Sequence, residues 1–403
     1  MPSNIADTNC MSAASKCLVP DLPSADDVLP YLRRIDRMRW YSNFGPLVCE
    51  FEEGLQRLLS EKDDRPQAGR IHVATLVSGH CALYVGLRLA GIGRGKTVLL
   101  PAVTFPSCPL AVLHSGAAVV LADIDPIAWT LTPQIARAAA ERTQIDAVMP
   151  VAIYGVPLPT SEWDEFSFDT GIPVLIDAAA AIDAQFPPGR GLVAYSLHAT
   201  KPLGIGEGGV LAGRDPDIIA RARQYTNFGM INRVTLTDGT NAKMSEYHAA
   251  VGLAQLNRWT AAKKKRNMLL QVYVRHLEPL LGYASLQPSI QTAVASHLML
   301  LLKQPIAEAV LALGREAGIG FHRPYLPPLY RHPHFEQLPL VDSHGVELPP
   351  EADVDKKWAQ MPNCERLREC LVGLPFHPFM DETDVNYVVN TLRIQLFRLF
   401  GNS

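Results

Sequence analysis

The sequence predicts an α/β fold with a central, mostly parallel seven-stranded sheet, helices on both faces of the sheet, and a smaller α+β domain after it. Seven short apolar runs between residues 73 and 213 are each bounded by Gly, Pro or Asp. The runs are continuously apolar instead of alternating, as strands are when helices cover both faces of a parallel sheet. From about residue 245 a long helical pattern replaces them, which indicates that a second structural unit follows.

The predicted strands and helices alternate along the first half of the chain. Segments 82–90, 109–115 and 133–142 lie between strands and are expected to be helices. Thr132 is expected to cap the last of them with Pro133 at its first position, where a missing N–H costs nothing. The seven predicted strands are VATLVS (73–78), TVLLP (97–101), AAVVLADID (117–125), AVMPVAIYG (147–155), PVLIDAAA (173–180), VAYSLH (193–198) and GGVLAG (208–213).

These patterns divide the chain into an N-terminal arm of residues 1–45, a large α/β domain over 46–265 and a small α+β domain over 266–403. The large domain begins with a helix over 50–59, where apolar residues recur with helical spacing. The small domain is expected to contain a strand at 298–303, a helix ending near Gly318, a Pro-rich stretch at 324–350 and a closing helix over 382–397.

Composition excludes several classes of protein. With 403 residues, 48% of them hydrophobic and 19% charged, the chain can bury a sizeable core and is not a disordered or collagen-like polymer. Lys+Arg 37 against Asp+Glu 40 gives a formal net charge of −3, without the basic excess of a nucleic-acid binder. No run approaches the roughly 18 apolar residues of a membrane span, and residues 1–30 lack a signal-sequence pattern. We therefore expect a cytoplasmic protein without nucleic-acid or membrane partners.

The cysteines and histidines predict neither a disulfide framework nor a metal centre. The 7 cysteines are scattered from Cys10 to Cys370, and none has CxxC or His-paired spacing. The histidines of the C-terminal stretch also lack the paired spacing of zinc ligands. We expect no metal.

Lys201, in SLHATKPLGIGEGG (196–209), is the leading candidate for catalysis. It follows a predicted strand and precedes a Gly-rich turn, so it lies neither on a helix face nor in a run of charges. A lysine amine in an apolar, Gly-lined pocket can form a Schiff base with a carbonyl group. The alternative is a solvated surface charge, which is the usual state of a lysine.

Asp177 is the second candidate, because it ends the apolar run PVLID. A carboxylate at the end of a buried strand faces the crevice where α/β sheets bind ligands, and its desolvation is costly without a partner. One interpretation is an N-cap for the next segment. Together with Lys201, a second interpretation fits better: Asp177 keeps a pyridine nitrogen protonated while the lysine holds the aldehyde of the ring.

An anion site and a stacking residue complete the set. In SGHCALYVGLRLAG (78–91), Ser78 and Gly79 lie between a strand and a helix beginning near Cys81, where backbone N–H groups and the positive helix end can hold a phosphate. Ser-Gly also occurs in such turns for steric reasons alone. Phe105, in PAVTFPS, can stack on a flat ring or belong to the core.

Together these segments resemble the DegT/DnrJ/EryC1/StrS family of sugar aminotransferases, which are pyridoxal-phosphate enzymes of fold type I. The resemblance extends over most of the chain, and the order and spacing of the motifs are more specific than any one of them. It rests on NFGPLVCEFEEGL (43–55), SGHCAL (78–83), LPAVTFPS (100–107), ADID (122–125), MPVAIYG (149–155), IDAAAA (176–181), SLHATKPLGIGEGG (196–209), NFG (227–229) and GTNAKMSEYHAA (239–250), with HRPYLPPLY (322–330) and VGLPFHPFMDETDV (372–385) matching more loosely.

The resemblance implies pyridoxal 5'-phosphate as the cofactor and a role for each matching residue. Lys201 would form the Schiff base and move the proton, Asp177 would pair with the pyridine nitrogen, and Phe105 would stack on the ring. The phosphate would be held by Gly79, His80, Ser196 and an Asn241 donated by the partner subunit. Ser78, Cys81, Ala180 and His198 complete the predicted cofactor-binding set. Since the family works as homodimers with active sites at the interface, at least a dimer is implied.

Two positions depart from the commonest family pattern. Most members have Thr where this chain has His80, so one hydroxyl contact to the phosphate must be replaced by the imidazole or by backbone. Many have Gln or His where this chain has Ala180, which cannot bond to the ring hydroxyl. These changes bear on cofactor affinity and substrate choice.

The resemblance implies a transaminase that moves an amino group from an amino acid, L-glutamate first among the candidates, to a keto sugar carried on a nucleotide diphosphate. One alternative is the same chemistry on another ketone of secondary metabolism, such as a cyclitol. The other is a non-catalytic pyridoxal-phosphate sensor, which His80 and Ala180 would suit. The cofactor motifs do not distinguish the substrates.

Overall fold

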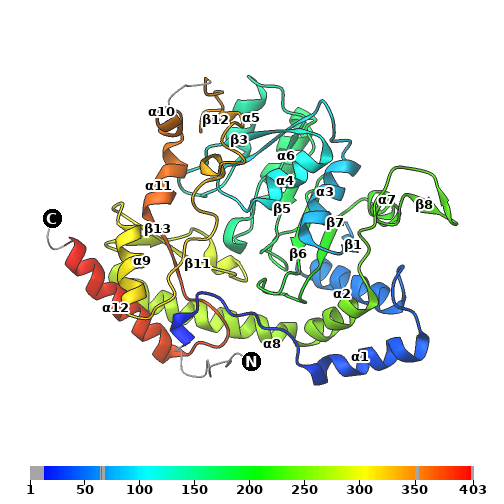
Figure 1. The fold of residues 1–403 in the computed structure, drawn as a ribbon, viewed down its shortest axis with the longest axis horizontal. Coiled ribbons are helices and arrows are strands. Elements are labelled where there is room, and N and C mark those ends of the chain that lie inside the picture. Colours follow the sequence, from blue (N-terminus) through cyan, green and yellow to red (C-terminus); the bar gives the residue numbers. More distant parts are fainter. Residues whose placement is uncertain (1–12, 64, 66–68, 350–353, 401–403) are drawn as a thin grey trace, which may run out of the picture.

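The computed structural model describes residues 13–63, 65, 69–349 and 354–400, and its centre is a mostly parallel sheet (Figure 1). Two four-stranded halves, ordered β12-β3-β2-β4 and β1-β7-β6-β5, are joined by parallel bridges from Val148 to Val174 and from Val151 to Asp177. The strands are β1 (His72–Leu76), β2 (Thr97–Pro101), β3 (Ala118–Ala122), β4 (Ala147–Val148), β5 (Leu175–Asp177), β6 (Leu192–Ser196), β7 (Gly209–Gly213) and β12 (Leu340–Val341).

The seven predicted strands are all present, and the mostly parallel arrangement is confirmed. Among the described strands of this central sheet, only β7 runs antiparallel to its neighbours, which are β1 and β6. The count of seven is incomplete, because β12 from the Pro-rich C-terminal stretch pairs in parallel with the edge of β3. β12 lies in a stretch whose prolines, among them Pro339, disfavour the prediction of a strand. The run predicted as a strand over 147–155 is also shortened, since β4 ends at Val148 and a turn follows at Ile153–Gly155.

Helices cover both faces of the sheet, and several begin at residues suited to capping. Thr132 caps α5 with Pro133 at the first position, as predicted, and Ser78 caps α3 by accepting the N–H of Cys81. The helices before the long connecting helix are α1 (Ala25–Met38), α2 (Pro46–Lys62), α3 (Gly79–Leu89), α4 (Ser107–Ser115), α5 (Pro133–Ala140), α6 (Thr160–Thr170) and α7 (Pro216–Thr226). α1 lies within the segment expected to be an arm, and α7 is followed by the hairpin of β8 (Met230–Ile231) and β9 (Val234–Thr235).

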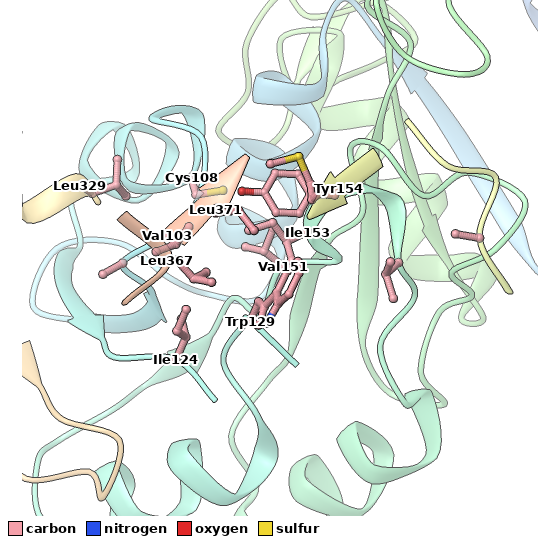
Figure 2. Packing of buried hydrophobic residues seen from close by; sticks show 14 of the residues in the cluster. Val103, Cys108, Ile124, Trp129, Val151, Ile153, Tyr154, Leu329, Leu367 and Leu371 are labelled. Atoms are coloured by element: carbon pink, nitrogen blue, oxygen red, sulfur yellow. The ribbon is translucent and has the colours of Figure 1, made fainter. Parts of the chain in front are cut away.

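Alternate strand residues supply two separate hydrophobic cores. Val98 and Leu100 of β2 belong to the cluster that also contains α3, α4 and the C-terminal elements, whereas Leu99 belongs to the cluster beneath α2, α5 and α6. Successive side chains of a strand point to opposite faces, so an uninterrupted apolar run is what a sheet covered on both sides requires. The first core extends from the sheet to the C-terminal part, as Figure 2 shows for Tyr154, Cys108 and Leu371.

The C-terminal part is built on the long helix α8 (Glu246–Leu277), which runs along one side of the molecule (Figure 1). It contains an antiparallel sheet ordered β10-β11-β13. The predicted boundary at residue 265 falls inside α8, and the division into two domains stays a prediction. The remaining elements are β10 (Ala284–Leu286), β11 (Leu298–Leu302), β13 (Leu371–Leu374), α9 (Ala307–Glu316), α10 (Val354–Trp358), α11 (Pro362–Cys370) and α12 (Glu382–Phe400).

Within the described residues, no helix is both long enough and apolar enough to cross a membrane.

Candidate active site

A cavity of about 480 Å³ lies at the carboxyl ends of β1, β2, β5 and β6. This is the edge of an open α/β sheet at which ligands bind, because the loops that follow the strands diverge there. Nine of the predicted site residues line the cavity together: Ser78, Gly79, His80, Phe105, Asp177, Ala180, Ser196, His198 and Lys201. The structure therefore brings most of the predicted set into one place.

Lys201 is presented to this cavity by the loop between β6 and β7. Its backbone N–H donates to the carbonyl of His198 at 2.9 Å, and Gly206 lies across the same loop with φ +103°, a conformation that favours glycine. No carboxylate within the described ranges lies within 4 Å of Lys201 Nζ, so the amine is not held in an ion pair. The loop thus leaves the amine available for chemistry in the cavity.

Asp177, the last residue of β5, is buried and acts as a hydrogen-bond acceptor at both oxygens. Its Oδ1 accepts the N–H of Ala179 at 2.9 Å, and its Oδ2 accepts the thiol of Cys108 at 2.8 Å. Burial raises the pKa of the carboxyl, while these two hydrogen bonds and the charge of Lys201 partly offset that rise. Burial, followed by the charge of Asp177, raises the pKa of Cys108 far above its usual value, so Cys108 is a thiol donor.

The N-terminus of α3 presents hydrogen-bond donors, whereas Asp177 is an acceptor. Ser78 Oγ accepts the N–H of Cys81 at 3.2 Å, and the N–H groups of Gly79 and His80 have no acceptor among the described residues. A Cβ on Gly79 would lie 2.8 Å from the Cβ of Ser196, so only glycine allows this close approach. Free N–H groups at a helix N-terminus form a site for an anion such as phosphate.

The His80 ring is already bonded within the protein. Its Nδ1 lies 3.0 Å from Ser107 Oγ and its Nε2 lies 3.1 Å from Nδ1 of His114. Burial, and secondly the neighbouring His114, lowers the pKa of His80. Of the two substitutes expected for the missing hydroxyl, the backbone N–H of residue 80 is the one left free.

Aromatic rings form the remaining wall of the cavity. Phe105 is 59% exposed and lies edge-to-face with Tyr325, at 6.2 Å between ring centroids. Tyr325 in turn stacks on Tyr154 at 5.3 Å. An exposed phenyl ring at the mouth of a cavity is suited to stacking on a flat ligand, so the structure favours that interpretation of Phe105 over a place in the core.

Two predicted residues are not brought to this cavity. Cys81 lies within α3, where only its backbone N–H reaches Ser78. Asn241 is outside the cavity of its own chain, and its Oδ1 accepts Nζ of Lys243 at 2.8 Å. Its predicted donation to a partner subunit stays a prediction.

Sequence reasoning missed several residues that line the cavity. Thr104, Ser107, Tyr154 and Glu207 lie inside or beside the quoted motifs, which could have indicated them. His297 and Tyr325 come from the C-terminal part. The only signal for His297 was its polar character directly before the apolar run at 298–302. Within the described ranges, no three His, Cys, Asp or Glu residues are grouped as metal ligands.

The relationship to known proteins agrees with this geometry. Residues 24–393 match the DegT/DnrJ/EryC1/StrS aminotransferase family. The chain belongs to this family. The predicted family, the fold type I α/β architecture, the aminotransferase activity and the dependence on pyridoxal 5'-phosphate are therefore confirmed.

Individual relatives of this aminotransferase align over most of its length. Protein Rv3402c of Mycobacterium tuberculosis (strain ATCC 25618 / H37Rv) is 31% identical over 386 residues, which are 92% of this chain and 87% of the relative. The GDP-perosamine synthase of Caulobacter vibrioides is 27% identical over 350 residues, 80% of this chain and 91% of that protein. The crystal structure of DesI in the presence of its TDP-sugar product has a TM-score of 0.77 and 26% identity, and the match covers 95% of this chain and 94% of that one.

Proposed function

We propose that this aminotransferase moves an amino group from L-glutamate to a keto sugar carried on a nucleotide diphosphate. The observation that carries the proposal is the meeting of Lys201, Asp177 and the free N–H groups of α3 in a single cavity. Support for the sugar comes from relatives: one is a GDP-perosamine synthase, and another was solved with its TDP-sugar product.

The cavity residues fit pyridoxal 5'-phosphate. Asp177 is buried, and no Lys, Arg or His of the described residues lies within 4 Å of it, so a protonated pyridine nitrogen would supply the missing positive partner. The N–H groups of Gly79 and His80 would hold the phosphate, with Ser196 Oγ beside them. Phe105 would cover the ring. When bound, this cofactor supplies an electron sink for charge that develops at carbon.

The protein's own groups then have separate tasks. Lys201 Nζ takes a proton from the α-carbon of the amino donor and returns a proton to the carbon of the acceptor that receives the amino group. Asp177 stays negatively charged while a cation faces it, with Cys108 and Ala179 fixing the direction of its oxygens. Apolar residues of the wall, among them Val151 and Ile153, limit the access of water.

We further propose a cytoplasmic homodimer in which Asn241 of one subunit reaches the phosphate end of its partner's cavity. The segment around Asn241 supports this, because the adjacent hairpin exposes large apolar side chains that a second copy could cover. These are Phe228, Ile231, Val234 and Leu236, which are 46%, 49%, 56% and 60% exposed. The two-domain division at residue 265 is retained as part of the proposal.

A substrate screen tests the proposed function. The cofactor-loaded protein is incubated with L-glutamate and a panel of dTDP-, UDP- and GDP-linked 4-keto and 3-keto sugars, and the product mass is recorded. Replacement of a ketone oxygen by an amino group in one sugar is the expected result. If glutamate converts the cofactor absorbance band but no sugar in the panel is aminated, the acceptor is another ketone. A band that glutamate leaves unchanged would instead favour a non-catalytic sensor.

A further inference from the structure

His297 is a buried histidine on the cavity wall that the steps above do not use. It lies just before β11, in the C-terminal part, and lines the cavity that also contains Lys201. Its ring is held by three aromatic neighbours: Tyr154 at 5.9 Å, Tyr325 at 6.0 Å and His322 at 5.6 Å between ring centroids. A ring packed in this way presents its two nitrogens in fixed directions.

The hydrogen bonds of Ser296 determine which nitrogen of His297 carries the proton. The hydroxyl of Ser296 donates to the carbonyl oxygen of Tyr154 at 2.8 Å, which uses its single hydrogen. Ser296 Oγ also lies 2.9 Å from Nδ1 of His297, so in that contact the hydroxyl oxygen is the acceptor. Both contacts of Ser296 are hydrogen bonds only when Nδ1 carries the hydrogen, and this tautomer leaves Nε2 as the nitrogen with a lone pair when the ring is neutral.

The surroundings of His297 keep the ring neutral. Burial is the largest cause that lowers its pKa well below the usual value, and His322, Lys201 and Arg266 add to the effect. Within the described part of the chain, Nε2 of His297 has no hydrogen-bond partner. Other protein atoms do not enclose it fully. A bare acceptor nitrogen thus remains in a cavity wall that is otherwise mostly apolar or aromatic.

The two proposed substrates differ in what they can offer to such a nitrogen. The amino group of glutamate is the group that is transferred, and the carboxylates that remain for recognition carry only lone pairs at neutral pH, so a lone pair on Nε2 disfavours them. A sugar has hydroxyl donors next to its carbonyl carbon. A neutral acceptor at this position therefore favours the acceptor substrate over the carboxylates of the amino donor.

We propose that His297 is a specificity-determining residue whose Nε2 accepts a hydrogen bond from a sugar hydroxyl of the acceptor substrate, with Ser296 fixing the tautomer that makes this possible. This inference rests on the proposed function and adds the group that recognises the acceptor. Ser296 acts through His297 and is a positioning residue.

Binding measurements on the cofactor-loaded protein test the proposal without turnover. The probes are dTDP-glucose and GDP-mannose, which have sugar hydroxyls but no ketone, and the references are dTDP and GDP. His297→Phe keeps a ring of similar size and removes the lone pair, so it is expected to weaken binding of the sugar nucleotide about 10- to 100-fold. Binding of the nucleotide alone should change much less. His334→Phe, at an exposed histidine outside the cavity, is the matched control.

Two further variants separate recognition from mere packing. His297→Gln supplies an amide oxygen that can accept the same hydrogen bond, so it should recover part of the lost affinity. Ser296→Ala leaves the ring in place and frees the tautomer, so it should give an intermediate loss even if His297→Phe folds poorly. In turnover with the keto sugar, His297→Phe should raise KM by a larger factor than it lowers kcat.

The outcomes distinguish the two proposals. Equal affinity of wild type, His297→Phe and Ser296→Ala for a sugar nucleotide that the wild type binds would overturn the role of His297 and leave the proposed function standing. If the wild type binds neither the sugar nucleotides nor any keto sugar of the panel, the assignment of a nucleotide sugar is wrong and the inference falls with it.

Discussion

The thiol of Cys108 donates a hydrogen bond of 2.8 Å to Oδ2 of Asp177, and both side chains are buried. Cys108 lies in α4, directly behind the end of β5, and Thr104 Oγ1 lies 3.2 Å from the same sulfur. The carboxylate that we propose faces a pyridine nitrogen is thus oriented by a thiol 69 residues away in the sequence. Its other oxygen is held by the local N–H of Ala179.

Cys108→Ala should weaken the cofactor site without removing it. The change leaves one oxygen of a buried carboxylate without its donor, which costs about 1–3 kcal/mol. We expect cofactor affinity to fall about 10-fold, with an altered absorbance maximum of the bound cofactor. Cys108→Ser, which keeps a donor, should restore most of the affinity. Equilibrium dialysis and absorbance spectra measure both, and identical spectra for all three proteins would argue against the role of the thiol.

Lys201→Ala should abolish amino transfer, because no other amine is presented to the cavity by the 196–209 loop. Turnover is expected to fall at least about 1,000-fold, in the range found when a catalytic acid–base group is lost. Borohydride should no longer trap the cofactor on the protein, as mass spectrometry of the intact chain would reveal. Lys303→Ala, at an exposed lysine outside the cavity, is the matched control. Full activity of the Lys201 variant would refute the mechanism.

Gly79→Ala and His80→Ala should affect cofactor binding to different extents. The Cβ added at residue 79 would lie 2.8 Å from Ser196 Cβ, and overpacking of this kind costs about 1–3 kcal/mol, so affinity should drop about 10- to 100-fold. His80→Ala removes a ring that is bonded to Ser107 and His114 but keeps the backbone N–H, and its effect should be smaller. Fluorescence titration of each apoprotein variant with the cofactor gives the two dissociation constants. A larger loss in His80→Ala would mean that the imidazole itself contacts the phosphate.

The buried ring of His322 should make the protein lose stability as the pH falls into the mildly acidic range. Burial lowers its pKa to about 4 from an ordinary 6.5, with the backbone of Gly373 acting weakly in the other direction. Above pH 6.5 the ring is neutral both folded and unfolded. As the pH falls from 6.5 towards 4, only the unfolded chain takes up the proton, so about 3 kcal/mol of stability is lost.

Urea unfolding at several pH values measures this linkage. His322→Phe cannot take up the proton, so between pH 6.5 and 4.5 its free energy of unfolding should fall less steeply than that of the wild type. The comparison uses the slope of the free energy of unfolding against pH. The absolute free energy is not compared, because the substitution also changes it through packing. Equal slopes would show that His322 is not the group responsible.

Glu246, at the start of α8, should stabilise the protein by capping the N-terminus of α2, although the two helices are far apart in the sequence. Its carboxylate accepts the N–H groups of Leu47 at 2.8 Å and Val48 at 3.1 Å, and the N-cap residue Gly45 has no side chain with which to do so. Glu246→Ala should lower the free energy of unfolding by about 2 kcal/mol, because two N–H groups lose their partner. Exposed Glu316→Ala should change it by less than about 0.5 kcal/mol. Chemical denaturation compares the two.

The local elements were predictable because their signals are local. Seven apolar runs, the Thr132 cap and the Ser78-Gly79 turn depend on residues a few positions apart, and all appear in the structure. The strand β12 was missed because its two residues are extended only by pairing with β3. His297 was missed because its chemistry depends on Ser296, on the Tyr154 carbonyl 142 residues away from Ser296, and on three surrounding rings.

The sequence by itself determined the α/β class and the family, and it singled out Lys201 and Asp177 as the candidate central pair, since short-range periodicity and motif order encode these features. The tertiary structure alone decided that Cys108 orients Asp177, that the His80 ring faces Ser107 and His114, and that Nε2 of His297 is left as a bare acceptor. The reason is physical: where a hydrogen goes, and how far burial shifts a pKa, depend on groups that only folding brings within about 3 Å of one another.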